Sequence, residues 1–452
     1  MNIILPEKVK YIIDRLEESG HEAFIVGGCV RDSMLGKTPF DWDICTDALP
    51  DRIIEIFKDR RVIETGLKHG TVTVLSDGDS YEVTTYRSDG VYSDNRRPDA
   101  VEFINDLKGD LIRRDFTINA MAYNPAIGLI DHFGGRNDLK NGIIKCVGNA
   151  NERVREDALR IMRALRFASQ LGFQIEKDTA AAMHENKRLL NNISSERIAA
   201  ELNKFLIGDN VRELIGSHIS IITELIPETI PMIGFEQNNP YHCYDVFEHS
   251  LYSIEQAPKD SIIRLTMFFH DIAKPACYTQ DGNGIGHFHG HPQMSSDMAR
   301  TILKRLKYDN DTIETITQLI IYHDTELQSD TKQVKRFLNR LGEERFRQLL
   351  VVKKADTMAH AAKRREHNLA TIEKTGFILD EIIEQDQCFS IKNLSINGND
   401  LVAAGITEGV MIGRILHILV DMVIDEKIKN EKAALLLKSE LLMNELLTHK
   451  IL

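Results

Sequence analysis

The sequence is poor in cysteine, in glycine and proline, and in long apolar runs, and each shortage excludes a class of protein. Its six cysteines include no Cys-x-x-Cys pair, so neither a disulfide framework nor a thiolate zinc site is expected. Among 452 residues, 28 glycines and 11 prolines are too few for a collagen-like or low-complexity chain. The apolar stretch from Ile415 to Ile424 is far shorter than the ~20 residues that span a bilayer.

An export signal and an excess of positive charge are also missing. The N-terminus reaches the charged residues Glu7 and Lys8 before an apolar signal core is complete. The chain has 56 lysines and arginines against 68 aspartates and glutamates, a net charge of −12, which is the wrong sign for a protein that coats nucleic acid through counterion release. We therefore expect a soluble, cytoplasmic protein in which a local basic surface holds any nucleic-acid partner.

Local patterns divide the chain into an α/β head and a helical remainder. Short strand-like runs alternate with helical ones up to about residue 145. From Asn151 onward apolar residues recur at helical spacing, and three prolines between Ile226 and Pro240 indicate a boundary. We expect four parts: a head at 1–145, a helical neck at 146–235, a second helical body at 236–370 and a helical tail at 371–452.

Two local features of the head suit phosphate chemistry. Gly27 and Gly28 lie between a predicted strand and a predicted helix, where bare backbone amides can approach a phosphate. Asp41 and Asp43 follow, and a strand over residues 41–44 would direct both carboxylates to one face. Paired carboxylates suit Mg²⁺, which bridges to substrate phosphates. Each feature alone also has an ordinary interpretation, as a tight turn or a solvated strand edge.

The order of further motifs resembles that of a known family. Gly27 to Asp32 followed by Asp41 to Asp43 resembles the signature of class II tRNA nucleotidyltransferases and poly(A) polymerases, members of the DNA polymerase β superfamily. The resemblance continues in order through His69 to Thr73, Glu82 to Arg87, Asp94 to Pro98, Arg113 to Ala120, Asp131 to Leu139 and Glu156 to Arg160. It implies an α+β protein whose polymerase-β-like head uses Asp41 and Asp43 as catalytic Mg²⁺ ligands.

A polar stripe follows the head, with members spaced three residues apart: Asp157, Arg160, Arg163 and Arg166. The resemblance implies that this stripe binds the nucleotide and reads its base. C and A both present an amino donor beside a ring-nitrogen acceptor, so one Asp acceptor with one Arg donor suits CTP and ATP but leaves UTP and GTP unpaired. The alternative is structural, because Glu156 and Arg160 form an i, i+4 pair that would stabilise a helix.

The resemblance also assigns nucleotide contacts within the head. They are Gly28 in the glycine turn, Arg31 near the triphosphate and Arg114 beside the nucleotide. For the neighbouring Asp115 a structural role, as an arginine partner or a helix cap, is the alternative. The polar segment from Arg87 to Arg97 resembles a flexible loop whose presence distinguishes enzymes that add the terminal A from those that add only C.

Histidines and aspartates mark the second half. His270 and Asp271 follow an apolar run, with His249 upstream and Asp356 downstream, which resembles the HD phosphohydrolase pattern. The resemblance implies that these four residues bind a divalent metal, whose identity stays open because imidazole and carboxylate ligands are permissive. Two further positions match places where some members hold a second ion: His291 and His323. Adjacent helical side chains point in different directions, so a shared ion requires either a bend in the backbone or a side-chain reach.

Basic residues between Lys332 and Arg365 offer a candidate RNA-contacting surface. The alternative is an ordinary helical surface, because Glu343 and Glu344 interrupt the run.

Together these patterns predict template-independent addition of CCA to the 3′ end of tRNA from CTP and ATP, by a protein with an appended HD domain. We expect Mg²⁺ in the head, a second divalent metal in the HD domain, and neither DNA nor a membrane as a partner. A poly(A) polymerase or an A-only tRNA nucleotidyltransferase shares these motifs. An alternative of another class is an HD phosphodiesterase or phosphatase whose first half only binds nucleotide, which the intact Asp41, Asp43 and Arg114 disfavour.

Overall fold

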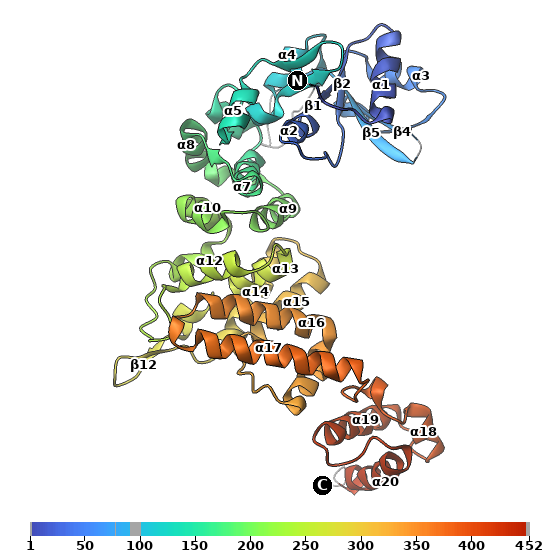
Figure 1. Ribbon diagram of the computed structural model, residues 1–452, viewed down its shortest axis with the longest axis vertical. Coiled ribbons are helices and arrows are strands. Elements are labelled where there is room, and N and C mark those ends of the chain that lie inside the picture. The colour runs from blue at the N-terminus through green and yellow to red at the C-terminus, as the bar shows by residue number, and fades with distance from the viewer. Residues whose placement is uncertain (1, 77, 91–100, 449–452) are drawn as a thin grey trace. The chain divides into compact units, whose positions relative to one another are not determined.

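The chain forms two compact units in the computed structural model, which describes residues 2–76, 78–90 and 101–448. One unit comprises Met1–Ile230 with Arg305–Lys307, and the other comprises Pro231–Lys304 with Tyr308–Leu452. The first unit contains a mixed α/β head followed by helices, and the second is almost entirely helical (Figure 1). The predicted α+β class, with an α/β head and a helical remainder, is confirmed.

The head is built on one seven-stranded sheet of order β3-β4-β5-β2-β1-β8-β9. β2 runs parallel to β5, whereas β1 is antiparallel to both β2 and β8. Burial alternates along β4, as the sequence pattern predicts for a strand with one core face, and β1 is buried along its whole length. The strands are β1 Ala23–Val26, β2 Ile44–Thr46, β3 Arg61–Gly66, β4 Thr71–Ser76, β5 Asp79–Thr85, β8 Met121–Asn124 and β9 Gly128–Asp131.

The helices of the first unit cover this sheet and continue beyond it. They are α1 Glu7–Glu18, α2 Gly28–Met34, α3 Pro50–Ile56, α4 Leu107–Ile112, α5 Gly135–Asn141, α6 Ala150–Glu156, α7 Leu159–Leu171, α8 Lys177–Asn186, α9 Ser195–Leu206, α10 Val211–Ser217 and α11 Ile219–Leu225. Two small strand pairs accompany them: β6 Arg87–Asp89 with β7 Val101–Phe103, and β10 Ile143–Ile144 with β11 Gln174–Ile175. α7 packs along α9 through a buried apolar face, which fixes the polar residues of α7 relative to the head.

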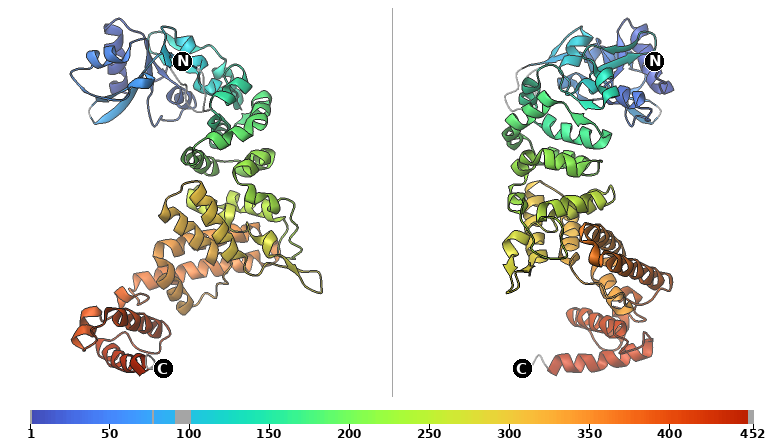
Figure 2. Two further views of the ribbon diagram at one scale, coloured as in Figure 1. Left: turned by 180° about the vertical axis from the view of Figure 1, so that it is seen from behind. Right: turned by 60° about the vertical axis from the view of Figure 1, so that its left-hand side comes forward.

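The second unit is a set of packed helices with one hairpin. Its elements are α12 Val246–Gln256, α13 Ser261–Phe269, β12 Thr279–Gln280, β13 Gly286–His287, α14 His291–Arg305, α15 Asn310–Tyr322, α16 Thr331–Ala359, α17 Ala362–Glu384, α18 Gly398–Ala403, α19 Gly409–Ile424 and α20 Lys432–Thr448. α16 bends at Gly342, whose φ of 75° is open to glycine at little cost. The last three helices gather around their own apolar core (Figure 2). Within the described residues, every helix falls short of the length and apolar content needed to cross a bilayer.

Candidate functional site

A cavity of about 870 Å³ in the first unit brings together all the residues predicted for the transferase. Its walls come from the glycine turn before α2, the segment before β2, the region after α4 and the start of α7. The predicted residues among its lining are Gly28, Arg31, Asp41, Asp43, Arg114, Asp157, Arg160, Arg163 and Arg166. Segments as far apart in sequence as residues 28 and 166 therefore share one polar chamber.

The two aspartates lie just before β2 rather than within it. The strand begins at Ile44, so the prediction of a strand over residues 41–44 is wrong for its first three residues. Although the Asp43 carbonyl still accepts a hydrogen bond from the Val26 amide at 3.0 Å, the ladder ends there. Burial, followed by the charge of Asp41, raises the pKa of Asp43 to about 6. Two carboxylates whose ionisation is mutually costly form a donor set that fits a divalent cation.

The glycine turn and Arg114 are in contact at the cavity wall. Gly27 has a φ of +81°, and a Cβ there would lie 3.1 Å from an Arg114 guanidinium nitrogen, so only glycine is unstrained at this position. Arg114 bonds the fully buried Asp110 at 3.2 Å, and Arg113 bonds the same carboxylate at 2.7 Å. Burial alone would raise the pKa of Asp110, but the two guanidiniums lower it. Asp110 thus holds both arginines at the cavity.

Asp115 orients the next arginine. Its carboxylate pairs with Arg163 at 2.5 Å and accepts a hydrogen bond from the Asn119 side chain at 3.0 Å, while Asn119 in turn accepts one from Arg31 at 2.7 Å. Burial opposes ionisation, but Arg163 lowers the pKa of Asp115 to about 2. Asp115 is therefore an arginine partner, as the structural alternative proposed. The chain Arg31–Asn119–Asp115–Arg163 links α2 to α7.

Phe167, which is not among the residues predicted for the site, contacts three arginines. The guanidinium carbons of Arg31, Arg163 and Arg166 lie 5.0, 5.4 and 4.1 Å from its ring centroid, distances typical of cation–π contacts. Arg166 also pairs with Glu201 of α9 at 2.9 Å. Phe167 directly follows Arg166 in the sequence. This position next to the polar stripe was the one feature that could have indicated its role.

Asp157 and Arg160 line the cavity but are not paired with each other. Asp157 is the C-cap of α6, with φ −132°, and contacts Arg197 at 3.3 Å. Arg160 is buried, bonds Glu156 at 2.9 Å and donates to two backbone carbonyls. The prediction of one continuous helical stripe is therefore wrong at Asp157, because the chain leaves the helical conformation between α6 and α7. The i, i+4 pair of Glu156 and Arg160 is formed.

The segment from Arg87 to Arg97 is only partly described. Arg87–Asp89 form β6, and the Arg87 side chain donates to the His69 carbonyl. Residues 91–97, like the motif Asp94 to Pro98, lie outside the described residues, so the link to terminal A addition stays a prediction.

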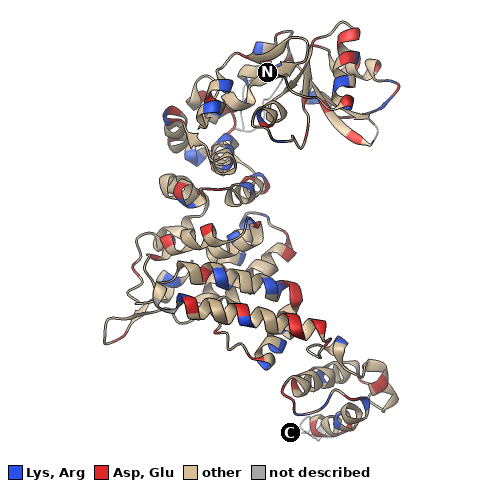
Figure 3. Ribbon diagram, in the orientation of Figure 1, with Lys and Arg blue, Asp and Glu red and all other residues tan. Residues whose placement is uncertain are grey.

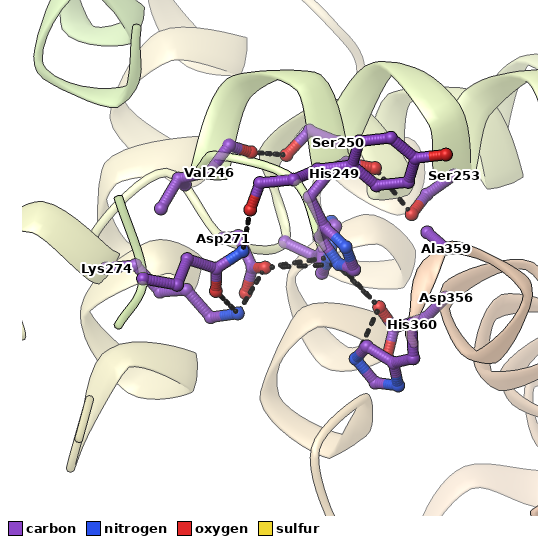
Figure 4. A network of polar contacts seen from close by, with 12 residues as sticks. Val246, His249, Ser250, Ser253, Asp271, Lys274, Asp356, Ala359 and His360 are labelled. Carbon is purple, nitrogen blue, oxygen red and sulfur yellow. Dashed lines mark hydrogen bonds and ion pairs between the residues drawn. The ribbon is translucent and has the colours of Figure 1, made fainter. Parts of the chain in front are cut away.

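A second cavity, of about 800 Å³, lies in the helical unit and gathers the predicted histidines. α13 ends at Phe269, so His270 and Asp271 occupy a turn rather than a helix, and their side chains meet at 3.2 Å. His270 itself keeps helical backbone angles, φ −57° and ψ −34°, so the reach of the two side chains rather than a bend at His270 brings them together. His249 on α12 contacts Asp356 on α16 at 2.9 Å (Figure 4). His270 contacts the same carboxylate at 3.4 Å.

The two additional histidines join the same cluster from the other side of Asp271. His291 and His323 lie 3.3 and 3.6 Å from an Asp271 oxygen. Their Nδ1 atoms, like that of His270, each meet the carbonyl three residues earlier, at 2.6–2.8 Å, which leaves Nε2 free for a ligand. All six predicted residues are thus brought together.

The electrostatics of this cluster are those of a cation site. Burial alone would lower the pKa of His270, but Asp271 raises it to about 10. Lys274, a further residue of the cluster, pairs with Asp271 at 2.7 Å. Burial alone would raise the pKa of Asp271, but His270 and Lys274 hold it well below its ordinary value. Two compatible ligand groups are His249 with His270 and Asp271, and Asp271 with His291 and His323.

The basic run from Lys332 to Arg365 is largely paired within the chain. Figure 3 shows acidic and basic residues interleaved along α16 and α17. Lys332 contacts Glu426 at 3.0 Å, and Arg347 contacts Asp380 at 2.8 Å. These pairs favour the ordinary-surface interpretation of the run.

Comparisons with known proteins bear on both units. Residues 23–145 match the family described as "Poly A polymerase head domain", and residues 172–216 match "Probable RNA and SrmB- binding site of polymerase A". Residues 288–438 match a family described as tRNA nucleotidyltransferase domain 2. The matches therefore extend from the head into the second helical unit.

Whole-chain relatives are named CCA-adding enzymes. The one from Levilactobacillus brevis is 36% identical over 95% of this chain and 96% of its own, and that from Lactiplantibacillus plantarum is 35% identical over 95% of each. A solved CCA-adding enzyme from Bacillus stearothermophilus, in complex with CTP, is 28% identical over 99% of both chains with a TM-score of 0.70. One from Thermotoga maritima, complexed with tRNA, shares the fold at 20% identity and a TM-score of 0.61. This chain belongs to the family of CCA-adding enzymes.

Proposed function

We propose that the arginine-lined cavity of the first unit is the active site at which this tRNA nucleotidyltransferase adds CCA to the 3′ end of tRNA from CTP and ATP. The observation that carries the proposal is the convergence of Asp41 and Asp43 with Arg31, Arg114 and the arginines of α7 on one chamber. Guanidiniums match phosphate and base edges through fixed forks of donors. An anionic triphosphate and a divalent ion therefore both have ligands there.

Asp41 and Asp43 are the residues that would hold the ion, which we propose to be Mg²⁺. When bound, Mg²⁺ favours ionisation of the attacking 3′-hydroxyl and neutralises charge on the departing pyrophosphate. Arg31, held by Asn119, and Arg114, held by Asp110, present positive charge toward the triphosphate side of the cavity. Because these side chains are already fixed by partners, little reorganisation is needed when the nucleotide binds.

Asp157 and Arg160 are proposed to select the base. An Asp acceptor and an Arg donor complement the edges shared by C and A, and the buried groups left unpaired by U or G would disfavour those bases. In the free protein Asp157 contacts Arg197, and Arg160 contacts Glu156. When a base binds, at least one of these ion pairs would be replaced by a hydrogen bond to the nucleotide.

The decisive assay supplies CTP alone, ATP alone or both to tRNA lacking CCA and to tRNA ending in CC. A CCA-adding enzyme incorporates CTP into the first substrate and ATP into the second, and Asp41→Ala and Asp43→Ala reduce both reactions by at least about 100-fold. Asp79→Ala, at an exposed ion pair with Lys8, is the matched control. A wild-type protein that uses only ATP is instead a poly(A) polymerase or an A-only enzyme.

We further propose that the histidine cluster is an HD phosphohydrolase site. The ligands of a first divalent ion would be four residues: His249, His270, Asp271 and Asp356. A second ion would be bound by Asp271 together with His291 and His323. The buried Asp271 carboxylate, the contacts of His249 and His270 with Asp356 and the adjacent cavity support this proposal. The transferase and the hydrolase would be separate sites in one chain.

The four-part division into 1–145, 146–235, 236–370 and 371–452 is likewise a proposal. The boundary between the two compact units, at Ile230 and Pro231, supports the division near residue 235, and the separate apolar core of α18–α20 supports a distinct tail. We also propose that the protein acts in the cytoplasm, where the free state of its six cysteines would persist.

A further inference from the structure

Three imidazoles form a compact group beside the proposed HD site. His242 precedes α12, His249 lies on α12 and His360 caps the end of α16. Each offers one ligand atom, and these atoms lie within 4.8 Å of one another. The backbones of His242 and His360 are joined by an isolated β-bridge, which holds the two rings in place although they are far apart in sequence. The ring centroids are 4.9–5.3 Å apart.

His249 differs from the other histidines of the cluster in the atom that it leaves free. In His270, His291 and His323, Nδ1 meets the carbonyl three residues earlier. For His249 that carbonyl belongs to Val246, and it accepts a hydrogen bond from the Ser250 hydroxyl at 3.1 Å (Figure 4). The Nδ1 atom of His249 is buried without a hydrogen-bond partner, and so is that of His242.

The second nitrogen of His249 has a carboxylate partner. Nε2 lies 2.9 Å from an Asp356 oxygen, and the Nε2 atom of His360 lies 3.7 Å from the same oxygen. A histidine that binds a metal through one nitrogen usually donates its other N–H to a carboxylate, which fixes the ring and its tautomer. Asp356 is placed to do this for His249, whose lone pair would then be on the unpaired Nδ1.

We propose that His242, His249 and His360 form a metal-binding subsite distinct from the proposed HD ligand sets. Three nitrogen ligands favour Zn²⁺, Co²⁺ or Ni²⁺ over Mg²⁺, which prefers oxygen. His242 and His360 line the 800 Å³ cavity, so a fourth position is open to water or a phosphate oxygen, as in sites where metal chemistry occurs. Lys274 does not oppose the ion as a free charge, because it is paired with Asp271.

The subsite shares His249 with the HD set, and this sharing makes the two separable by mutation. A neutral imidazole has one lone pair for a metal, so His249 serves one ion at a time. Removal of His242 or His360 should affect only the new subsite, whereas removal of His270 should affect only the HD set. The inference does not depend on hydrolase activity, because metal binding is measured directly.

The test titrates Co²⁺ into metal-free, full-length protein and records binding by calorimetry and by visible absorption. We expect His242→Ala and His360→Ala each to weaken one class of Co²⁺ site by at least about 10-fold, and to remove the intense absorption of a low-coordinate, nitrogen-bound Co²⁺. His270→Ala should retain that absorption. His289→Ala, in the same cavity but stacked on His287, is the matched control and should behave as wild type.

Two outcomes would overturn the proposal. One is binding and absorption by His242→Ala and His360→Ala that equal those of wild type. The other is loss of the absorption in His270→Ala alone, which would assign the ion to the HD set. A thermal melt of each variant, measured in parallel, reports whether the second unit, which holds all four substitutions, is folded.

Discussion

The ionised carboxylate of Asp43 is costly to the folded protein in the absence of a cation. Its pKa is raised to about 6 from 3.8, about two units, and each unit corresponds to about 1.36 kcal/mol. The folded state therefore loses stability as the pH rises through about 6, relative to a protein with a neutral side chain at this position.

Asp43→Asn should accordingly stabilise the metal-free protein by up to about 3 kcal/mol above pH 6. The gain should vanish below about pH 4, where Asp43 is protonated in both the folded and the unfolded state. Urea unfolding with a chelator present, at pH 7.5 and pH 4, measures the difference. An equal gain at both pH values would show that packing, rather than charge, is responsible.

At Asp157 and Arg160 the competing roles are base selection and structural support. If they read the base, Asp157→Ala and Arg160→Ala should lower the preference for CTP and ATP over UTP and GTP by about 5–150-fold, the value of one or two buried unpaired groups. Single-turnover incorporation of each of the four nucleotides into tRNA measures this preference. Arg155→Ala, on the exposed side of α6, is the control.

A purely structural role would give a different pattern. Because Arg160 holds Glu156 and the carbonyls of Arg153 and Arg113, its loss would then slow all four nucleotides equally, lower the melting temperature and yield no misincorporation.

At the scale of elements, α7 works as a unit because one aromatic ring holds its arginines. Phe167 is buried and contacts Arg31, Arg163 and Arg166 through its face. Cation–π contacts contribute about 0.5–2 kcal/mol each. The ring therefore stabilises the positions of three guanidiniums that line the cavity and would otherwise be hydrated.

Phe167→Leu should raise the KM for both CTP and ATP by about 3–30-fold, whereas Phe167→Tyr, which keeps the ring, should retain near wild-type values. The control is Phe205→Leu, which makes the same exchange at a fully buried position on α9. Steady-state kinetics with each nucleotide measure the effect. Equal KM changes in the Leu and Tyr variants, or in Phe205→Leu, would contradict the arginine-holding role.

α13 illustrates how the end of a helix creates a site. His270 directly follows Phe269 and keeps helical angles, φ −57° and ψ −34°, yet its side chain and that of Asp271 meet at 3.2 Å. The Asp271 carboxylate also reaches His291 and His323, from α14 and the end of α15.

At the scale of the whole molecule, the two cavities belong to different compact units. His270→Ala combined with Asp271→Ala should abolish metal-dependent hydrolysis of 2′,3′-cyclic nucleotides and leave CCA addition unchanged. Both activities are measured on one preparation, after a thermal melt has shown a cooperative transition. Loss of CCA addition in the folded variant would mean that the second unit contributes to the transfer reaction, and persistent hydrolysis would place that activity elsewhere.

The sequence alone was sufficient to predict the division of the chain into an α/β head and a helical remainder. Period-two and period-3.6 patterns distinguished the head from the helical remainder, because strands and helices bury one face at those spacings. The resemblance of ordered motifs to known families, rather than local periodicity, predicted the aspartates, the arginines and the histidine cluster as site residues.

Only the tertiary structure decided which partner each charged side chain takes. The ion pairs of Asp115 with Arg163 and of Glu201 with Arg166 join segments 48 and 35 residues apart, and a local pattern carries no information about such contacts. The departure of Asp157 from a helix, where its carboxylate contacts Arg197 of α9, has the same origin. Hydrogen bonds and ion pairs with distant segments outweigh local propensities, which amount to only about 1 kcal/mol per residue.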